Sequence, residues 1–419
     1  MQRVYEEKQD CCGCGACGDV CPVGAIRMVT DREGFRYPEV DPQKCMDCGR
    51  CEKVCPVKHS GRMDTVGEKA AGTDGTGVEA TGADTTGTGT RSRETGSQDA
   101  GRETLAAQEV MCYGGRAKED AVRSQSSSGG IFPVLAEYVL SQGGFVYGAA
   151  YTDQMEVAHR EISSPAELDV LKRTKYVQSN GEGMYRSIEG RLKEGHPVLF
   201  VGTPCQAHAL QLFLGREYPG LVVVALICYG VPSPGVWQSY VAYLERKHKG
   251  KMTSFFFRDK RRGDSGHTCA FVIDGREYAG SLYQDPYCQM YFANAILRPS
   301  CHACRFCTTE RDSDFTIGDF WGIEKVKPGL DDGMGHSVIL LHSDKARQVW
   351  EEVKGNLSWF ACGKEDVLQP RLLAPTPAWK GRERFWSWYG RLPFGVFQRL
   401  FVLFRRAGAL WGRGRKVRK

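Results

Sequence analysis

Two cysteine runs near the start of the chain decide how its first part folds: Cys11-x2-Cys14-x2-Cys17-x3-Cys21-Pro22 and Cys45-x2-Cys48-x2-Cys51-x3-Cys55-Pro56. An iron-sulfur cube needs a thiolate at each iron corner, and a C-x2-C-x2-C loop presents three of them without strain. The fourth thiolate of each cube must come from elsewhere in the chain. The two runs therefore predict two 4Fe-4S clusters in one small, metal-dependent module.

The spacing is similar to that of bacterial two-cluster ferredoxins, in which the cysteine before the proline ligates the cluster of the other run. Cluster one then takes Cys11, Cys14, Cys17 and Cys55. Cluster two takes Cys45, Cys48, Cys51 and Cys21. A zinc site or a disulfide knot fits the pattern less well, because zinc takes four ligands per site and not two interleaved sets. Cys12 lies outside the repeat and is interpreted as a spare thiol.

Length and composition place this module in a larger protein. The chain has 419 residues with ordinary hydrophobic and charged fractions, enough for one or two further domains with cores of their own. No apolar signal segment precedes Cys11, and no run of eighteen apolar residues occurs. Eighteen cysteines in such a chain favour a reducing, cytoplasmic location over a secreted disulfide framework.

Composition divides the chain into four expected parts. Residues 1–58 form the two-cluster 4Fe-4S ferredoxin domain. Residues 59–108 are rich in Gly, Thr, Ala, Asp, Ser and Glu and predict a disordered linker. Residues 109–379 alternate between helical and strand patterns, and residues 380–419 form a basic, aromatic tail.

The C-terminal tail carries most of the positive charge. Residues 380–419 contain twelve Lys or Arg and one Glu, a net charge of +11 within a chain of +6. Its aromatic residues suit two structures: a tail on an anionic membrane surface, peripheral at the inner membrane, or a final helix that packs its aromatics on the body. No recognition module accompanies the charge, so we expect no nucleic acid partner.

A hydroxyl- and glycine-rich segment, Ser126 to Gly130, precedes a helix predicted over Ile131 to Leu140. The serines are typical N-capping residues, and a strand is expected over Gly144 to Ala150. Such an entry to a helix leaves backbone N–H groups free for an anion, often a phosphate, although an ordinary cap explains it equally.

Two further strands end in cysteine. A strand over His196 to Val201 is followed by Cys205 at the start of a helix, and a strand over Leu221 to Ile227 ends in Cys228. Ligands of open α/β sheets bind beyond the carboxyl ends of the strands, where both cysteines fall. The helix start also favours a thiolate at Cys205.

A third cysteine run, Cys301-x2-Cys304-x2-Cys307, precedes a strand expected over Asp314 to Asp319. With the two strand-end cysteines it predicts a third metal site. The favoured ligands are Cys205, Cys228, Cys301 and Cys304, with Cys307 as a competing thiol. Zinc or a trio without metal would explain the run in isolation. Four other cysteines lack ligand spacing and are interpreted as structural: Cys112, Cys269, Cys288 and Cys362.

Beyond the linker the chain resembles the family of the beta subunit of coenzyme F-420 hydrogenases and dehydrogenases. The segments that carry the resemblance are Ser126 to Phe132, Lys175 to Ser179, Gly202 to Gln206, Ile227 to Pro234 and Gly318 to Gly322. It implies an α/β flavoprotein domain over residues 109–379 that binds FAD and a 4Fe-4S cluster. It also supports the four-cysteine third cluster. The expected fold class is thus an α+β ferredoxin module joined by a disordered linker to an α/β flavoprotein domain.

The resemblance implies the flavin contacts: Ser127, Ser128, Gly129, Gly130, Lys175 and Tyr176. The segment that contains Ser127 to Gly130 suits a pyrophosphate, because it precedes the N-terminus of a helix. Lys175 could neutralise phosphate or tune the isoalloxazine ring. The expected redox partner is a deazaflavin coenzyme or a ferredoxin-like carrier, with a partner enzyme or subunit.

Two function classes follow. The first is an oxidoreductase that passes electrons between FAD and 4Fe-4S clusters. The second is an electron-relay or adaptor subunit without its own catalysis, linked in some relatives to polysaccharide loci. No paired carboxylates and no Ser-His-Asp arrangement point to a general acid or base, so no catalytic residue is assigned.

Overall fold

The N-terminal module is a small α+β unit in this computed structural model, which describes residues 4–60, 109–262 and 266–413, the side chains of 406–413 excepted. A short antiparallel ribbon pairs β1 (Ile26–Thr30) with β2 (Arg36–Val40). The remaining elements are short and start beside the cysteine runs: η1 (Lys8–Asp10), α1 (Ala16–Val20) and α2 (Arg50–Lys53). The two α-helices begin at Gly15 and Gly49, whose positive φ values of 88° and 68° suit glycine. The predicted ferredoxin-like module is confirmed.

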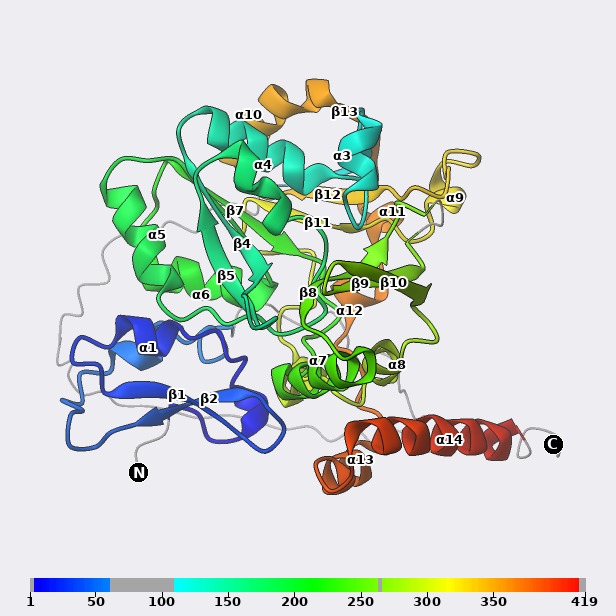
Figure 1. Ribbon diagram of the computed structural model, residues 1–419. Coiled ribbons are helices and arrows are strands. Elements are labelled where there is room, and N and C mark those ends of the chain that lie inside the picture. The colour runs from blue at the N-terminus through cyan, green and yellow to red at the C-terminus, as the bar shows by residue number, and fades with distance from the viewer. Residues whose placement is uncertain (1–3, 61–108, 263–265, 414–419) are drawn as a thin grey trace, which may run out of the picture.

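The body is built on one eight-stranded mixed sheet (Figure 1). Its strand order is β13 (Leu357–Cys362), β3 (Met111–Ala117), β12 (Ser337–Leu341), β11 (Phe315–Asp319), β7 (Leu221–Leu226), β6 (Val198–Gly202), β4 (Phe145–Tyr151) and β5 (Val157–Ile162). The four strands β11, β7, β6 and β4 run parallel, and the outer strands pair antiparallel. The predicted α/β class of the body is confirmed.

Helices cover both faces of this sheet. On one face lie α4 (Ile131–Ser141) and α10 (Asp344–Val353), packed against Leu199 and Val201. On the other lie α5 (Met184–Lys193) and α6 (Pro204–Leu214), packed against Val198 and Phe200. Alternate residues of β6 therefore serve opposite faces, and all four are buried, as expected for a central strand.

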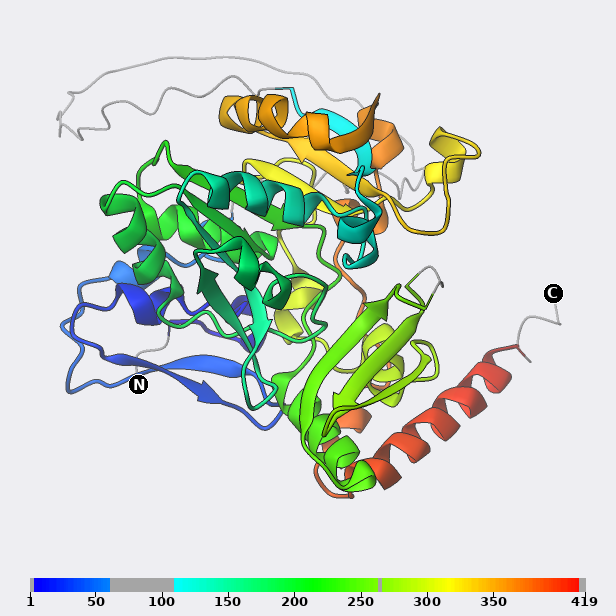
Figure 2. The ribbon, with the colours of Figure 1, turned by 45° about the horizontal axis from the view of Figure 1, so that its top comes forward.

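A second layer is formed by residues 234–262, 266–292 and 382–413. It contains a three-stranded antiparallel sheet of β10 (Arg276–Ser281), β9 (Thr268–Ile273) and β8 (Met252–Asp259). The helices packed there are α7 (Pro234–His248), α8 (Pro286–Phe292), α13 (Arg382–Trp388) and α14 (Phe394–Arg413). Figure 2 shows α14 running along the outside of this layer and away from the eight-stranded sheet. Short helical turns complete the body: α3 (Asp120–Ser124), η2 (Pro165–Val170), η3 (Pro299–Ala303), α9 (Ile323–Val326), η4 (Lys354–Asn356), α11 (Lys364–Val367) and α12 (Pro370–Leu373).

The N-terminal module packs directly on the body below α5 and α6 (Figure 1). Asp19 accepts hydrogen bonds from the backbone N–H groups of Gly183 (2.8 Å) and Tyr185 (3.1 Å) at the start of α5. Gly34 touches Gly235, where an added Cβ would lie 2.4 Å from the facing Cα. The two glycines permit a backbone approach that no other residue allows.

Most elements expected around the cysteines are present. The structure confirms the predicted helices as α4 and α6 and the predicted strands as β4, β6, β7 and β11, within a few residues. One expectation about the start of α4 is wrong: Gly130, with φ 86°, is the N-cap residue, and no side chain caps the helix. The nearby serines bond elsewhere instead. The linker expected over 59–108 lies outside the described residues from 61 onward.

Part of the basic tail packs its aromatics on the body, as one of its two interpretations predicts. Five of its aromatic side chains are buried against the body: Phe385, Trp386, Phe394, Phe397 and Phe401. Trp388 and Phe404 are exposed. Among the described residues, none of the helices is both long and apolar enough to cross a membrane.

Candidate functional site

The first predicted cluster set lines a single cavity. Cys11, Cys14 and Cys17 of the first run meet Cys55 of the second run there, together with apolar side chains of the module. The four thiols lie close enough to interact electrostatically, and burial raises the pKa values of Cys11, Cys17 and Cys55. Negative charge in this cavity thus needs a metal to balance it, and the residues fit a 4Fe-4S cluster.

The second predicted set lines a neighbouring cavity. Cys45, Cys48 and Cys51 surround it with Cys21 of the first run. Cys21 is buried, and its Sγ accepts a hydrogen bond from the N–H of Ala25 at 3.2 Å. Each Cys-Pro cysteine thus reaches the cavity of the other run, which is the crossing expected from the sequence.

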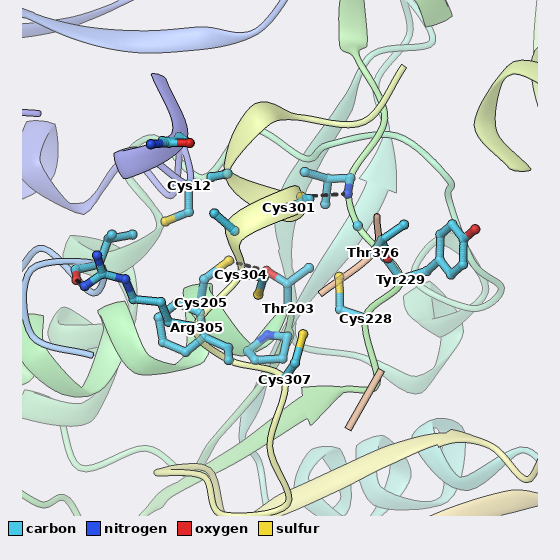
Figure 3. Close-up of a pocket in the computed structure, with 18 residues that line it drawn as sticks. Cys12, Thr203, Cys205, Cys228, Tyr229, Cys301, Cys304, Arg305, Cys307 and Thr376 are labelled. Carbon is cyan, nitrogen blue, oxygen red and sulfur yellow. Dashed lines mark hydrogen bonds between the residues drawn. The ribbon is translucent and has the colours of Figure 1, made fainter. Parts of the chain in front are cut away.

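A third cavity lies where the module meets the body (Figure 3). Its cysteines come from the module, from the ends of β6 and β7, and from η3 and the loop after it: Cys12, Cys205, Cys228, Cys301, Cys304 and Cys307. Because β6 and β7 are adjacent and parallel, their carboxyl ends deliver Cys205 and Cys228 to the same edge of the sheet. The structure therefore brings together all four thiols of the favoured set.

The thiols of this group interact electrostatically with one another. Each of Cys205, Cys228, Cys301 and Cys304 interacts with the other three, and burial raises the pKa of Cys228 and Cys301, the latter to about 12. Cys307 bonds to Cys304 and also interacts with Cys228. Within the described part of the chain, no three of these sulfurs lie within 4.8 Å of one another.

Cys12, expected to be a spare thiol, lies between two of the sites. It lines both the first and the third cavity. Its thiol hydrogen bonds with Cys14 and with Cys205, and these bonds raise its pKa while lowering that of Cys205 to about 7. Nothing in the cysteine spacing could have shown this, because the contact forms only when the module docks on the body.

The two segments expected to contact a flavin lie side by side. Ser127 Oγ accepts a hydrogen bond from the N–H of Thr174 at 2.8 Å. Ser128 Oγ donates to the carbonyl of His336 at 3.0 Å, and the N–H of Gly129 donates to Ser337 Oγ at 3.0 Å. These hydroxyls hold the loop in place, which leaves recognition of a ligand to backbone groups and to neighbouring cations.

Lys175 and Tyr176 are placed differently from one another. The Nζ of Lys175 donates to the carbonyls of Val170 (3.0 Å) and Lys172 (2.7 Å), and burial lowers its pKa to about 7. Tyr176 packs between Phe257 and Tyr291, and burial raises its pKa to about 12. The ammonium group of Lys175 thus stabilises the turn in which it lies. Tyr176 instead contributes an aromatic ring and a hydroxyl group to this region.

Cations that the sequence did not single out surround these segments. Lys260 Nζ donates to the carbonyl of Ser128 at 2.7 Å, and burial lowers its pKa to about 7. Arg258 joins the Tyr176 hydroxyl to Asp319. Two further arginines, Arg173 and Arg261, lie over the ring of Phe256, 4.9 and 4.7 Å from its centroid. The arginines here pair with carboxylates: Arg258 with Asp319, Arg261 with Asp259 and Glu277, and Arg173 with Asp169.

Comparisons with known proteins agree with this geometry. Residues 195–359 match the family model for the C-terminal part of the beta subunit of coenzyme F420 hydrogenase/dehydrogenase. Residues 10–59 match the model of a 4Fe-4S dicluster domain. The resemblance stated from the sequence motifs is thereby confirmed over residues 195–359, and residues 10–59 are the iron-sulfur, electron-transfer part of the protein.

One solved structure resembling the chain is that of the F420-reducing [NiFe] hydrogenase complex from Methanosarcina barkeri, determined with xenon derivatization. The identity is 18% and the TM-score 0.40, and the match covers 60% of this chain and 81% of that one. A comparison with curated proteins found no match.

Proposed function

We propose that the chain is an iron-sulfur flavoprotein oxidoreductase. In this proposal electrons pass between an FAD and three 4Fe-4S clusters, with a deazaflavin coenzyme or a ferredoxin-like carrier as partner. The observation that carries it is the continuity of the three cysteine cavities. The first and second exchange Cys21 and Cys55, and the first and third share Cys12.

The proposed ligands of the third cluster are Cys205, Cys228, Cys301 and Cys304. A flavin supplies the exchange between hydride and single electrons when bound. The protein's own contribution is to orient the bound cofactor and to exclude water from the site. The Ser126–Gly130 loop and Tyr176 would hold the cofactor's phosphates and ring. Lys260 and Arg258 would keep these two segments in place, since they bond to Ser128 and to Tyr176.

Anaerobic purification followed by iron, sulfide and flavin analysis tests the proposal. About twelve irons and about one FAD per chain are expected. About eight irons without flavin would contradict both the third cluster and the enzyme. That result would leave a relay subunit that delivers electrons from the dicluster domain to a separate enzyme.

We further propose that α14 contacts an anionic membrane surface. Its buried face, Phe394, Phe397 and Phe401, packs on the body, whereas Leu403 and Phe404 are 61% and 62% exposed. Val396, about two turns earlier on the helix, is also exposed. With a tail of net charge +11, an apolar face flanked by arginines has the chemistry of an interfacial helix.

Vesicle sedimentation tests this contact. The full chain should bind phosphatidylcholine vesicles only when phosphatidylglycerol is added, and salt should weaken the binding. Replacing Leu403 and Phe404 together by Ser should abolish it. Leu373→Ser, which alters an equally exposed side chain of α12, should leave it unchanged. Equal binding to neutral vesicles, or by the double variant, would refute the contact.

A further inference from the structure

Arg298 is a fully buried cation at the boundary between the dicluster domain and the body. Its exposed fraction is 0%, and it directly precedes η3, which carries Cys301. Its guanidinium lies against the rings of Phe35 and Tyr37, 5.3 and 4.2 Å from their centroids. A body residue therefore reaches into the dicluster domain, where the aromatic rings enclose it.

The N–H groups of Arg298 donate hydrogen bonds at and around the loop that carries Cys11. Its Nε donates to the carbonyl of Cys11 at 2.7 Å, and its Nη2 lies 3.5 Å from Cys11 Sγ. Nη2 also donates to the carbonyl of Arg36 at 2.9 Å, and Nη1 donates to Gln178 Oε1 at 3.0 Å. The fit is close, because a Cβ on Gly13 would lie 2.6 Å from Nη1.

The charge of Arg298 has no carboxylate to balance it. None of the ion pairs found among residues 4–60, 109–262 and 266–413 includes it. Its strongest electrostatic partner is the Cys11 thiol, followed by the Tyr37 hydroxyl and the Cys12 and Cys301 thiols. A buried charge without a partner is costly, whereas thiolates holding an iron-sulfur cluster carry net negative charge. The cation therefore matches an anionic cluster at the Cys11 site.

We propose that Arg298 is a positioning residue that raises the reduction potential of cluster one. Reduction adds one electron to an already negative group, and a nearby buried cation stabilises that added charge. Hydrogen bonds to a ligand sulfur act in the same direction. Cluster one, on the side of the dicluster domain that faces the third cavity, thereby becomes a better electron acceptor than it would be without Arg298.

The test is a potentiometric titration of the full chain followed by EPR. Arg298→Gln removes the charge, and Arg298→Lys keeps it without the planar fork. Arg186→Gln is the matched control, because Arg186 is an exposed arginine at the same boundary and donates to the backbone carbonyl of Cys21 at 2.9 Å. All chains are compared at full iron content.

In Arg298→Gln, one of the two potentials of the dicluster domain should become more negative while the other stays in place. The shift should be smaller in Arg298→Lys and absent in Arg186→Gln. Unchanged potentials in Arg298→Gln would overturn the proposal, as would equal shifts of both.

A second measurement needs no variant and remains decisive if Arg298→Gln loses iron. In the native chain grown with guanidino-15N arginine, pulsed EPR of reduced cluster one should show a weak 15N coupling. Absence of that coupling would overturn the proposal. Both readouts depend on the dicluster domain alone, so they hold whether or not the chain binds a flavin or a third cluster.

Discussion

Six cysteine side chains line the third cavity, and four of them are enough for a cube. The favoured set is Cys205, Cys228, Cys301 and Cys304, each of which interacts with the other three. We therefore expect Cys228→Ser to lose about four irons per chain, because a serine hydroxyl replaces a thiolate that the cluster requires. Iron and sulfide analysis measures the loss. Cys307→Ser is the control and should keep its full iron content. If Cys307→Ser loses iron and Cys228→Ser keeps it, then Cys307 is the ligand and Cys228 is the extra thiol.

Two buried histidines make stability depend on pH. Burial lowers the pKa of His159 and of His342 to about 4, from about 6.5 in an unfolded chain. The unfolded state therefore binds more protons below pH 6.5, and the stability present above that pH is lost as the pH falls toward 4. Each histidine should lower the free energy of unfolding by about 1.4 kcal/mol between about pH 7.5 and about pH 5.5.

Urea denaturation at these two pH values measures the effect. His159→Gln should reduce the pH dependence by the share of one histidine, about 1.4 kcal/mol, since His342 and other shifted groups continue to titrate. An identical pH dependence in His159→Gln and the native chain would contradict the assignment.

At the scale of elements, the start of α5 depends on a residue of the dicluster domain. Asp19 accepts from two backbone N–H groups there and is itself buried. Asp19→Ala should cost about 0.5–2 kcal/mol, because those donors lose the cap. Hydrogen exchange of the first turn of α5 should accelerate, and Asp153→Ala, an exposed carboxylate after β4, should not change it. Unaltered exchange in Asp19→Ala would show that the cap is dispensable.

The sequence predicts the elements that carry cysteines and misses others for physical reasons. The hydrophobic runs of β6 and β7 identify buried parallel strands, and the turn residues after them place Cys205 and Cys228. By contrast β10 is mostly exposed, so it lacks an alternating pattern. β3 contains Gly114, which weakens a strand pattern, because Phe360 fills the space of its Cβ. The reason for a glycine at this position is therefore visible only when the partner strand is known.

At the scale of the whole molecule, local sequence patterns do not predict how the two domains dock. The ligand spacing predicts both dicluster sets, since each depends on short loops. Arg298, however, bonds to Cys11 across 287 residues of sequence, and Cys12 meets Cys205 only in the docked chain. Neither residue has a motif of its own. Sequence thus predicts the cysteine sites individually, and the fold determines how they are joined.

The same organisation predicts how the molecule responds to loss of iron. In the dicluster domain two cysteine-lined cavities lie in the interior, and several of its buried side chains join cores of the body: Phe35, Tyr37, Cys14, Ala16 and Val54. The eight-stranded sheet has apolar cores on both faces. Oxidation and chelation of the iron should therefore unfold residues 4–60 while the sheet stays folded.

Hydrogen exchange with mass spectrometry measures this response. Protection should disappear in β1, β2 and α1 and persist in β6, β7 and α4. The start of α5 should lose protection as well, because Asp19 no longer caps it. Cys45→Ser provides a milder control, since it removes a ligand of the second cavity alone and should leave the docked face near Cys12 protected. Cooperative loss of protection in the entire sheet would contradict the prediction, because it would make the clusters part of one folding unit with the body.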